Sequence, residues 1–301
     1  MTSLTLALDW TANINHLGFF VALEKGFYTN EGLDVQITTP DEDNYQLTPA
    51  KKVELGLADF ALCPTESIIS YRTKTKPFPL IAIAAILQSD LSAVVTKKSG
   101  DISSPKDLDG RSYGSYMARY EDGIVKEMVK NDGGKGDIKI TYPKKLGIWD
   151  TVINDETDAT WIFVNWEGVE AKKAGVELNY FNLKDFGIPY SYSPVLGANE
   201  SLVAKKKETY QAFLRATKKG FLYHKENELE SLEILRNKLP KSEKDFDLAS
   251  ALAITKDHFG DENSWGKIDI SVLNDFLAWL REKGLEKSEI LSKEIFTNTC
   301  L

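Results

Sequence analysis

Residues 4–28 read LTLALDWTANINHLGFFVALEKGFY, and this stretch decides the fold. The apolar run Leu4–Leu8 is too short for a helix and predicts a buried strand. A helix is predicted from about Asn15 to Lys25, with Gly26 ending it. The loop between them is dense in polar and aromatic groups. Because loops at the carboxyl ends of strands bind ligands in open α/β sheets, we expect a small-molecule site here.

Length, composition and charge limit the classes to which the protein can belong. At 301 residues the chain is long for one hydrophobic core, so two lobes are expected. Its 42% apolar and 27% charged residues are typical of an ordinary globular protein. The net charge of -8 and the lack of a basic stripe argue against a nucleic-acid partner. Cys63 and Cys300 form no disulfide framework, and the histidines have no metal-ligand spacing.

Two segments share one design. In Val53–Ser67 and again in Val152–Gly168, a helix end and a turn lead through an aspartate into a brief apolar strand. The aspartates are Asp59 and Asp158, and a polar loop opening another helix follows each strand. Any two βα units share part of this pattern. We nevertheless interpret the segments as equivalent parts of two lobes, each offering a strand-end loop to a shared cleft.

The expected architecture is a two-lobed α/β fold with a ligand cleft between the lobes and two crossing strands. Lobe I comprises residues 1–89 plus 194–301, and lobe II comprises residues 90–193. The crossings are placed at residues 88–90 and 190–198. Four late helices are assigned to lobe I: Glu208–Tyr223, Glu226–Leu239, Phe246–Phe259 and Ser271–Lys283.

The candidate ligand-binding residues are those in loops at predicted strand ends. They are Asp9, Trp10, Asn13, His16, Thr65, Glu66 and Ser67 from lobe I, and Tyr116, Arg119, Tyr120, Glu121, Asn165, Trp166, Glu167, Tyr190 and Tyr192 from lobe II and the second crossing. Aromatic rings provide stacking area, and carboxylates accept hydrogen bonds from amino groups. The set therefore favours a planar, nitrogen-rich or weakly cationic ligand, although Arg119 could hold one anionic group.

Several of these residues have purely structural alternatives. Asp9 and His16 could cap the loop and helix, and Glu66 and Glu167 could stabilise helix N-termini. Trp149 and Trp161 are predicted to be core residues. No nucleophile elbow, P-loop, dinucleotide fingerprint or zinc-protease motif occurs, so no catalytic residue and no metal site is predicted.

The opening pattern Leu-Asp-Trp-x-x-Asn-x-Asn-His-x-Gly-Phe from Leu8 onward strongly resembles one family. The similarity continues through Glu31–Val35, Trp166–Gly168, Gly187–Tyr190 and Tyr192–Val195, covering most of the first two hundred residues. The family is that of thiamine-pyrimidine-precursor proteins with the type 2 periplasmic-binding-protein fold. It includes binding proteins of ABC importers for formylaminopyrimidine-type compounds and fungal-type hydroxymethylpyrimidine phosphate synthases.

The family has a binding branch and a synthase branch, and the residues of this chain distinguish between them. The synthases use a lysine and a histidine, four residues apart, that engage pyridoxal phosphate; here those positions correspond to Cys63 and Ser67. The synthases' glycine-bearing phosphate loop corresponds to Met117–Tyr120, and their cysteine cluster to Tyr190–Pro194. Without the lysine there is no internal aldimine. The resemblance therefore implies a binder without cofactor, and pyridoxal phosphate belongs only to the alternative.

The sequence thus predicts a solute-binding protein that closes on a thiamine pyrimidine precursor or a similar small heteroaromatic compound. One alternative is a divergent cytoplasmic enzyme making such a precursor, and another is a binder of alkylsulfonates or other organic anions through Arg119. We expect a monomer that works with an ABC importer permease. No stretch approaches the about 18 apolar residues of a membrane span. As written the chain predicts a cytoplasmic location, and removal of a signal would instead imply a periplasmic or membrane-anchored protein.

Overall fold

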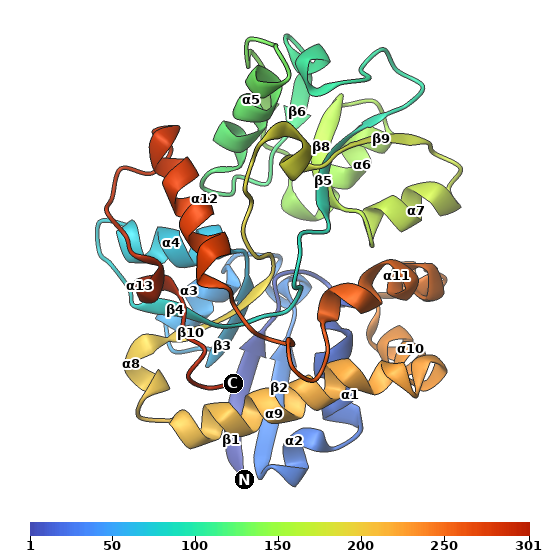
Figure 1. Ribbon diagram of the computed structural model, residues 1–301. Coiled ribbons are helices and arrows are strands. Elements are labelled where there is room, and N and C mark those ends of the chain that lie inside the picture. Colours follow the sequence, from blue (N-terminus) through green and yellow to red (C-terminus); the bar gives the residue numbers. More distant parts are fainter. The chain divides into compact units, whose positions relative to one another are not determined.

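The computed structural model describes residues 1–301, which divide into two compact units (Figure 1). Unit 1 contains Met1–Asp90, Ser191–Leu273 and Ser288–Leu301, and unit 2 contains Leu91–Tyr190 and Asn274–Lys287. The chain therefore passes between the units at the two expected places, and again before Asn274 and after Lys287.

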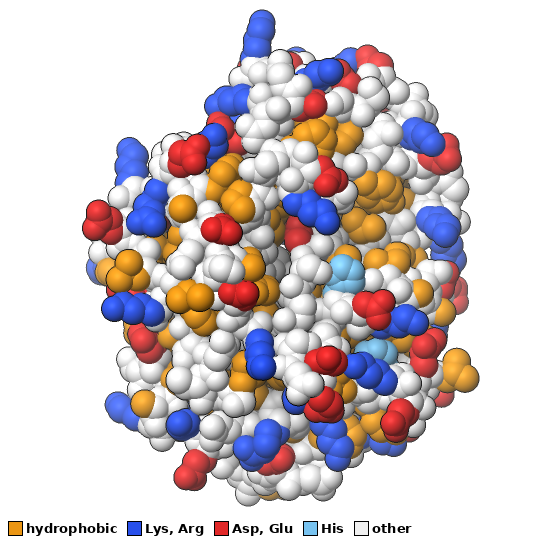
Figure 2. Space-filling model, in the orientation of Figure 1, with side chains coloured by type: hydrophobic (Ala, Val, Ile, Leu, Met, Phe, Trp, Pro, Cys, Tyr) orange, Lys and Arg blue, Asp and Glu red, His pale blue; other side chains and the backbone are white.

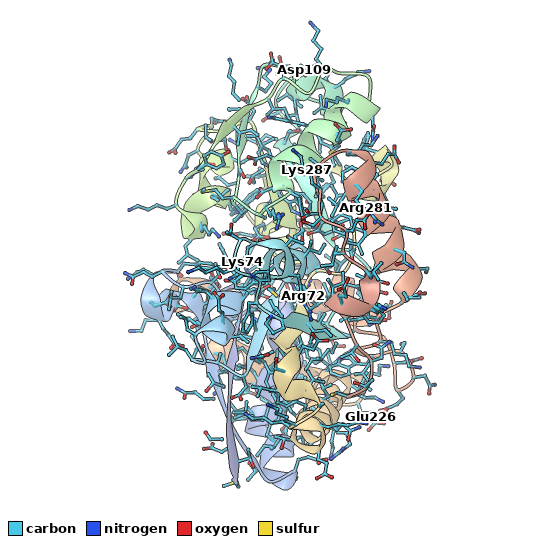
Figure 3. All side chains as sticks on the ribbon, turned by 90° about the vertical axis from the view of Figure 1, so that its left-hand side faces the viewer. Arg72, Lys74, Asp109, Glu226, Arg281 and Lys287 are labelled. Carbon is cyan, nitrogen blue, oxygen red and sulfur yellow. The ribbon has the colours of Figure 1, made fainter.

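The segment Asn274–Lys287 corrects the predicted lobe boundaries, which assigned it to lobe I. Its side chains pack within unit 2: the ring of Phe276 lies 5.5 Å from that of Tyr190, and Leu285 lies against Gly123. Figure 3 labels Lys287 at the end of this segment. The apolar pattern of the helix was correctly recognised, but nothing in that pattern indicates which lobe it covers.

Unit 1 is built on a mixed five-stranded sheet of order β2-β1-β3-β10-β4. The strands are β1 (Thr2–Ala7), β2 (Leu33–Thr38), β3 (Phe60–Cys63), β4 (Leu80–Ala85) and β10 (Val195–Asn199). β1 runs parallel to β2 and β3, whereas β10 is antiparallel to β3 and β4. The carboxyl end of β3 therefore meets the start of β10, where Cys63 pairs with Val195.

The helices of unit 1 confirm the predicted helical segments. They are α1 (Leu17–Glu24), α2 (Phe27–Asn30), α3 (Pro49–Glu54), α4 (Thr65–Thr73), α8 (Glu200–Val203), α9 (Lys207–Leu222), α10 (Glu228–Lys238), α11 (Leu248–Thr255) and α13 (Ser292–Ile295), while α12 (Ile270–Glu282) is divided between the units. α1 packs closely on α9. The approach is so close that a Cβ atom at Gly220 would lie 2.1 Å from the Gly18 carbonyl oxygen. Two stacked rings, Phe60 and Phe213 at 4.2 Å, join this helix layer to the sheet. The packing fixes the start of α1 and hence the loop before it.

Unit 2 repeats the sheet order of unit 1. Its strands are β5 (Ser92–Lys97), β6 (Ser112–Gly114), β7 (Lys139–Thr141), β8 (Ala159–Phe163) and β9 (Leu178–Phe181), and its helices are α5 (Glu121–Asn131), α6 (Ile148–Ile153) and α7 (Glu167–Lys173). The order is β7-β6-β8-β5-β9, with β6 parallel to β7 and β8, and β5 antiparallel to β8 and β9. Trp149 lies in the apolar core of this unit, as predicted.

The two sheets correspond strand by strand, and equivalent aspartates mark the match. The Asp59 carboxylate accepts a hydrogen bond from the Thr5 N–H at 3.0 Å, and the Asp158 carboxylate accepts one from the Ser112 N–H at 2.7 Å. Each bond joins the strand after the aspartate to its parallel neighbour, β1 or β6. The likeness of the two predicted segments therefore reflects a repeated βα design.

The surface gives no strong charge field on the face drawn in Figure 2, where acidic and basic side chains are interspersed. No helix in the structure is both long enough and apolar enough to cross a membrane.

Candidate functional site

The loop after β1 is held rigidly by its own residues. Asn13 begins the short 3-10 helix Ile14–His16, and its side-chain oxygen accepts the Asn15 N–H at 2.9 Å. Its side-chain amide donates to the Thr11 carbonyl at 3.0 Å. Both the oxygen and the nitrogen of the Asn13 side-chain amide are therefore hydrogen-bonded. Asn13 acts as the N-cap of the helix, a role that asparagine favours.

Asp9 and His16 form the polar centre of this loop. The His16 Nε2 lies 2.8 Å from Asp9 Oδ1, and the His16 Nδ1 accepts the Asn13 N–H at 3.3 Å. His16 is fully buried, whereas the Asp9 side chain is 21% exposed. The carboxylate thus faces outward from a buried imidazole.

Tyr45 is a member of this cluster that sequence reasoning missed. Its hydroxyl donates to the Asp9 backbone carbonyl at 2.8 Å, and its ring lies 6.0 Å from that of Trp10. Tyr45 has a φ of 58°, an uncommon left-handed conformation for a bulky residue. A signal was present, because Tyr45 follows β2, whose carboxyl end lies beside that of β1.

The end of β3 brings a second set of predicted residues to the same edge of the sheet. Burial, with the carboxylates of Asp9 and Glu66, raises the pKa of the Cys63 thiol. Glu66 is buried in the first turn of α4, and Ser67, one residue later, is half-buried. A neutral thiol among carboxylates is a poor nucleophile.

Tyr192 belongs to unit 1 and not, as predicted, to the second lobe. The Thr65 hydroxyl donates to the Tyr192 carbonyl at 2.7 Å, which joins the chain near β10 to the start of α4. The Tyr192 hydroxyl accepts the Asp269 N–H at 2.9 Å, and the side chain is buried.

The corresponding loop of unit 2, after β6, folds around Glu121. The buried Glu121 carboxylate accepts the Tyr113 hydroxyl at 2.8 Å and the N–H groups of Tyr116 and Ala118 at 3.0 and 3.1 Å. Burial raises the pKa of Glu121, although these hydrogen bonds oppose the shift. Burial also lowers the pKa of the nearby Lys145, another residue that the sequence reasoning missed.

Glu286 connects this loop to the C-terminal segment. Arg119 forms an ion pair with Glu286 at 2.7 Å, and the Tyr120 hydroxyl donates to the same carboxylate. The Arg119 guanidinium also lies 5.2 Å from the centre of the Tyr120 ring. Glu286 is only 3% exposed, so Arg119 supplies a charged partner to a carboxylate that water barely reaches. Neither Tyr120 nor Arg119 is held by loop residues alone.

The end of β8 carries the remaining predicted residues of unit 2. Asn165 and Trp166 are buried, and the Glu167 carboxylate accepts the Phe163 N–H at 3.0 Å. Tyr190 packs on Trp161, with their rings 5.2 Å apart. Trp161 was predicted to be a core residue but is half-buried beside this predicted site residue.

The predicted residues therefore gather into two clusters, one at the strand ends of each unit. No group of three or more histidine, cysteine, aspartate or glutamate side chains has the geometry of a metal site. Among the residues named for the cluster in unit 1 are carboxylates and rings but no lysine or arginine, which suits a ligand that donates hydrogen bonds and stacks.

The fold is that of the periplasmic binding proteins. The periplasmic aliphatic sulphonate binding protein SsuA from Escherichia coli superposes with a TM-score of 0.71 at 12% identity, covering 98% of this chain and 91% of that one. The predicted fold class is thus confirmed.

The chain belongs to the NMT1/THI5-like family, whose model matches residues 13–230. It is 28% identical over 309 residues to a formylaminopyrimidine-binding protein of Halalkalibacterium halodurans, covering 99% of this chain and 90% of the relative. It is also 24% identical over 239 residues to a 4-amino-5-hydroxymethyl-2-methylpyrimidine phosphate synthase of Legionella pneumophila, covering 79% of this chain and 74% of the relative.

Proposed function

We propose that this protein is a solute-binding protein that captures a thiamine pyrimidine precursor of the formylaminopyrimidine type. The observation that carries the proposal is the cluster in unit 1, where the outward-facing Asp9 carboxylate lies beside Trp10 and Tyr45. An aminopyrimidine offers both a flat ring and amino N–H donors, so it matches these groups. The formylaminopyrimidine-binding relative, aligned over nearly the whole chain, supports the same ligand class.

In this proposal the ring of the ligand stacks on Trp10 of unit 1, and Tyr116 of unit 2 is a second candidate for stacking. Both side chains are half-buried and lie in equivalent loops, after β1 and β6. Tyr120 and Tyr192 suit the role less well, because both are buried with their hydroxyls engaged. Asp9, Glu66 and Glu167 supply carboxylate acceptors, whereas Asn13 supports the loop as a cap.

The proposed binding mode is capture of the ligand by the conformation of the chain that makes the better contacts with it. We further propose that the loaded protein delivers its ligand to an ABC importer permease, and therefore acts outside the cytoplasm. Co-purification with a permease from native membranes, in the presence of ligand, tests this assignment.

The two alternatives fit the residues less well. An organic anion would need an available cation, but Arg119 already pairs with the buried Glu286. A synthase using pyridoxal phosphate would need an amine at Cys63, and a thiol forms no imine there; the buried, neutral thiol does not fit that cofactor. We therefore derive no catalytic step.

Isothermal titration calorimetry with formylaminopyrimidine tests the proposal. We expect one saturable site, and we expect Trp10→Ala to weaken binding about tenfold or more because the stacking face is lost. Tyr223→Ala is the matched control, since Tyr223 is a half-buried aromatic residue whose partners Phe27 and Glu230 lie outside both clusters. Equal affinities of the native protein and the Trp10 variant would exclude the stacking role.

A further inference from the structure

The fully buried His16 has no free edge with which to contact a ligand. One ring nitrogen lies against Asp9, and the other lies against the backbone of Asn13. Its position at the start of α1 is fixed by the packing of α1 on α9. His16 must therefore act on the site through a neighbour.

The hydrogen bonds define which tautomer His16 adopts. A backbone N–H can only donate, so the Asn13 N–H requires a lone pair on His16 Nδ1. The proton of the neutral ring is then on Nε2, which donates to Asp9 Oδ1 at 2.8 Å. The backbone of the capping turn thus selects the tautomer that donates to the carboxylate.

This donation orients Asp9. Among the described residues, His16 is the only hydrogen-bond donor to the Asp9 side chain, and the Tyr45 hydroxyl holds the Asp9 backbone carbonyl. The second carboxylate oxygen, Oδ2, therefore remains for another donor, and the Asp9 side chain is 21% exposed. Burial and the Asp9 carboxylate raise the pKa values of Tyr45 and Cys63, so a phenol and a thiol lie close to this carboxylate.

We propose that His16 is a positioning residue that sets ligand affinity through Asp9. Its Nε2–H holds Oδ1, so that Oδ2 accepts an amino N–H of the bound heteroaromatic ring. The inference rests on the proposed function, because it assigns the orientation of a carboxylate in the same site. It also predicts the ligand chemistry at this point, namely a neutral or cationic N–H donor and not an anion.

Two amide substitutions separate the two ring nitrogens. His16→Gln places an amide N–H near the position of Nε2 and loses the acceptor at Nδ1. His16→Asn places an amide oxygen near Nδ1, which keeps the acceptor for the Asn13 N–H, but is too short to reach Asp9. The two variants therefore retain different hydrogen bonds of the same side chain.

Binding of formylaminopyrimidine and thermal unfolding are measured for both variants. We expect His16→Asn to weaken binding about tenfold to a hundredfold while keeping most of the thermal stability, since a hydrogen bond to a charged group is lost. We expect His16→Gln to bind within about threefold of the native protein but to unfold at a lower temperature. Asp9→Asn should weaken binding at least as much as His16→Asn, and the double variant should be little weaker than Asp9→Asn alone.

If His16 had a purely structural role, ligand affinity would follow thermal stability. His16→Gln, the less stable variant, would then bind the ligand more weakly than His16→Asn. That order would overturn the proposal, as would full additivity in the double variant. His224→Gln is the matched control, because His224 is also buried in unit 1, where its Nδ1 bonds the Phe221 carbonyl and its ring packs against Phe259. It should change stability without changing affinity.

Nitrogen-15 spectra of histidine-labelled protein read the tautomer directly. The chain has three histidines, so loss of one signal set in His16→Gln assigns His16. We expect a pyridine-like Nδ1 and a protonated, pyrrole-like Nε2, and the reverse pattern would overturn the inference. If this pattern is found but no aminopyrimidine binds, the proposed function fails while the geometry stands. If the ligand binds without the expected order of variants, the positioning role fails and the function stands.

Discussion

The two units have matching sheets, but they hold their equivalent loops in different ways. The loop after β1 is fixed mainly by neighbours in the chain, since Asn13 and His16 lie within seven residues of Asp9. The loop after β6 has a local anchor in Glu121, and it is also tied to Glu286, which is 166 residues from Tyr120. The loop after β1 is therefore preformed locally, whereas the loop after β6 depends on the segment Asn274–Lys287.

The two loops therefore differ in what holds them in place. In unit 1 a buried imidazole fixes the Asp9 carboxylate, which is the recognition point in our proposal. In unit 2, the segment Asn274–Lys287 and the loop containing Arg119 share one buried ion pair, so loop order and segment packing are coupled.

The largest expected loss of stability comes from removing Glu286, which links the loop containing Arg119 to the segment Asn274–Lys287. Glu286→Ala leaves Arg119 without its buried partner and removes the acceptor of the Tyr120 hydroxyl, so we expect about 3 kcal/mol of lost stability. This is at the low end for buried pairs, because the Arg119 side chain is 32% exposed. Urea unfolding measures the loss. Glu282→Ala, at a carboxylate that is 72% exposed on the same segment, is the control and should change stability by less than about 0.5 kcal/mol. Similar behaviour of the two variants would show that the loop does not depend on Glu286.

The equivalent aspartates Asp59 and Asp158 test how closely the two units match. Asp59→Ala and Asp158→Ala each remove an acceptor for a backbone N–H on the neighbouring strand, so each should cost about 1–2 kcal/mol. Asp59 also pairs with Lys206, but that lysine side chain is 40% exposed and should add little. Denaturant midpoints of the two single variants test the match. A large loss in one unit and none in the other would contradict the equivalence of the two βα segments.

The smallest expected effect is a pair of opposite pH dependences within unit 2. Burial raises the pKa of Glu121, so its contribution to stability is present at acid pH and is lost as the pH rises through that raised value. Burial alone would raise the pKa of Asp158, but hydrogen bonds from Ser112 outweigh it and the pKa is lowered. The contribution of Asp158 is therefore present above the ordinary aspartate range and is lost as the pH falls.

Unfolding free energies between about pH 3 and pH 7 measure both slopes. The unfolding free energy of Glu121→Gln should fall further below that of the native protein at low pH than at neutral pH. The unfolding free energy of Asp158→Asn should fall further below that of the native protein at neutral pH than at low pH. The same sign of pH dependence for both variants would contradict these assignments.

Local patterns made unit 1 predictable from sequence. The strand, the loop and the helix around Asp9 follow from an apolar run, a capping asparagine and Gly26, whose φ of 68° ends the helix. The repeated Asp59 and Asp158 segments were also visible, because each is a contiguous pattern. The ends of the late helices were predicted to within a few residues, since their apolar periodicity is local.

Long-range contacts were not predictable in this way. The pairing of Arg119 with Glu286, the contact of Tyr45 with Asp9 and the place of Tyr192 in unit 1 join residues that are distant in the chain. A single sequence carries no signal for which buried carboxylate meets which arginine. Residue types at strand ends predicted the site's general chemistry, but tertiary packing determines which side chains cap loops and which remain for a ligand.

Competition calorimetry tests the central claim most directly. Formylaminopyrimidine and an alkanesulfonate are titrated separately into the native protein, and then the first is titrated into protein that contains a large excess of the second. The account predicts one saturable site for the aminopyrimidine, no heat of binding for the sulfonate and no competition between them. Saturable binding of the sulfonate with none of the aminopyrimidine would contradict it.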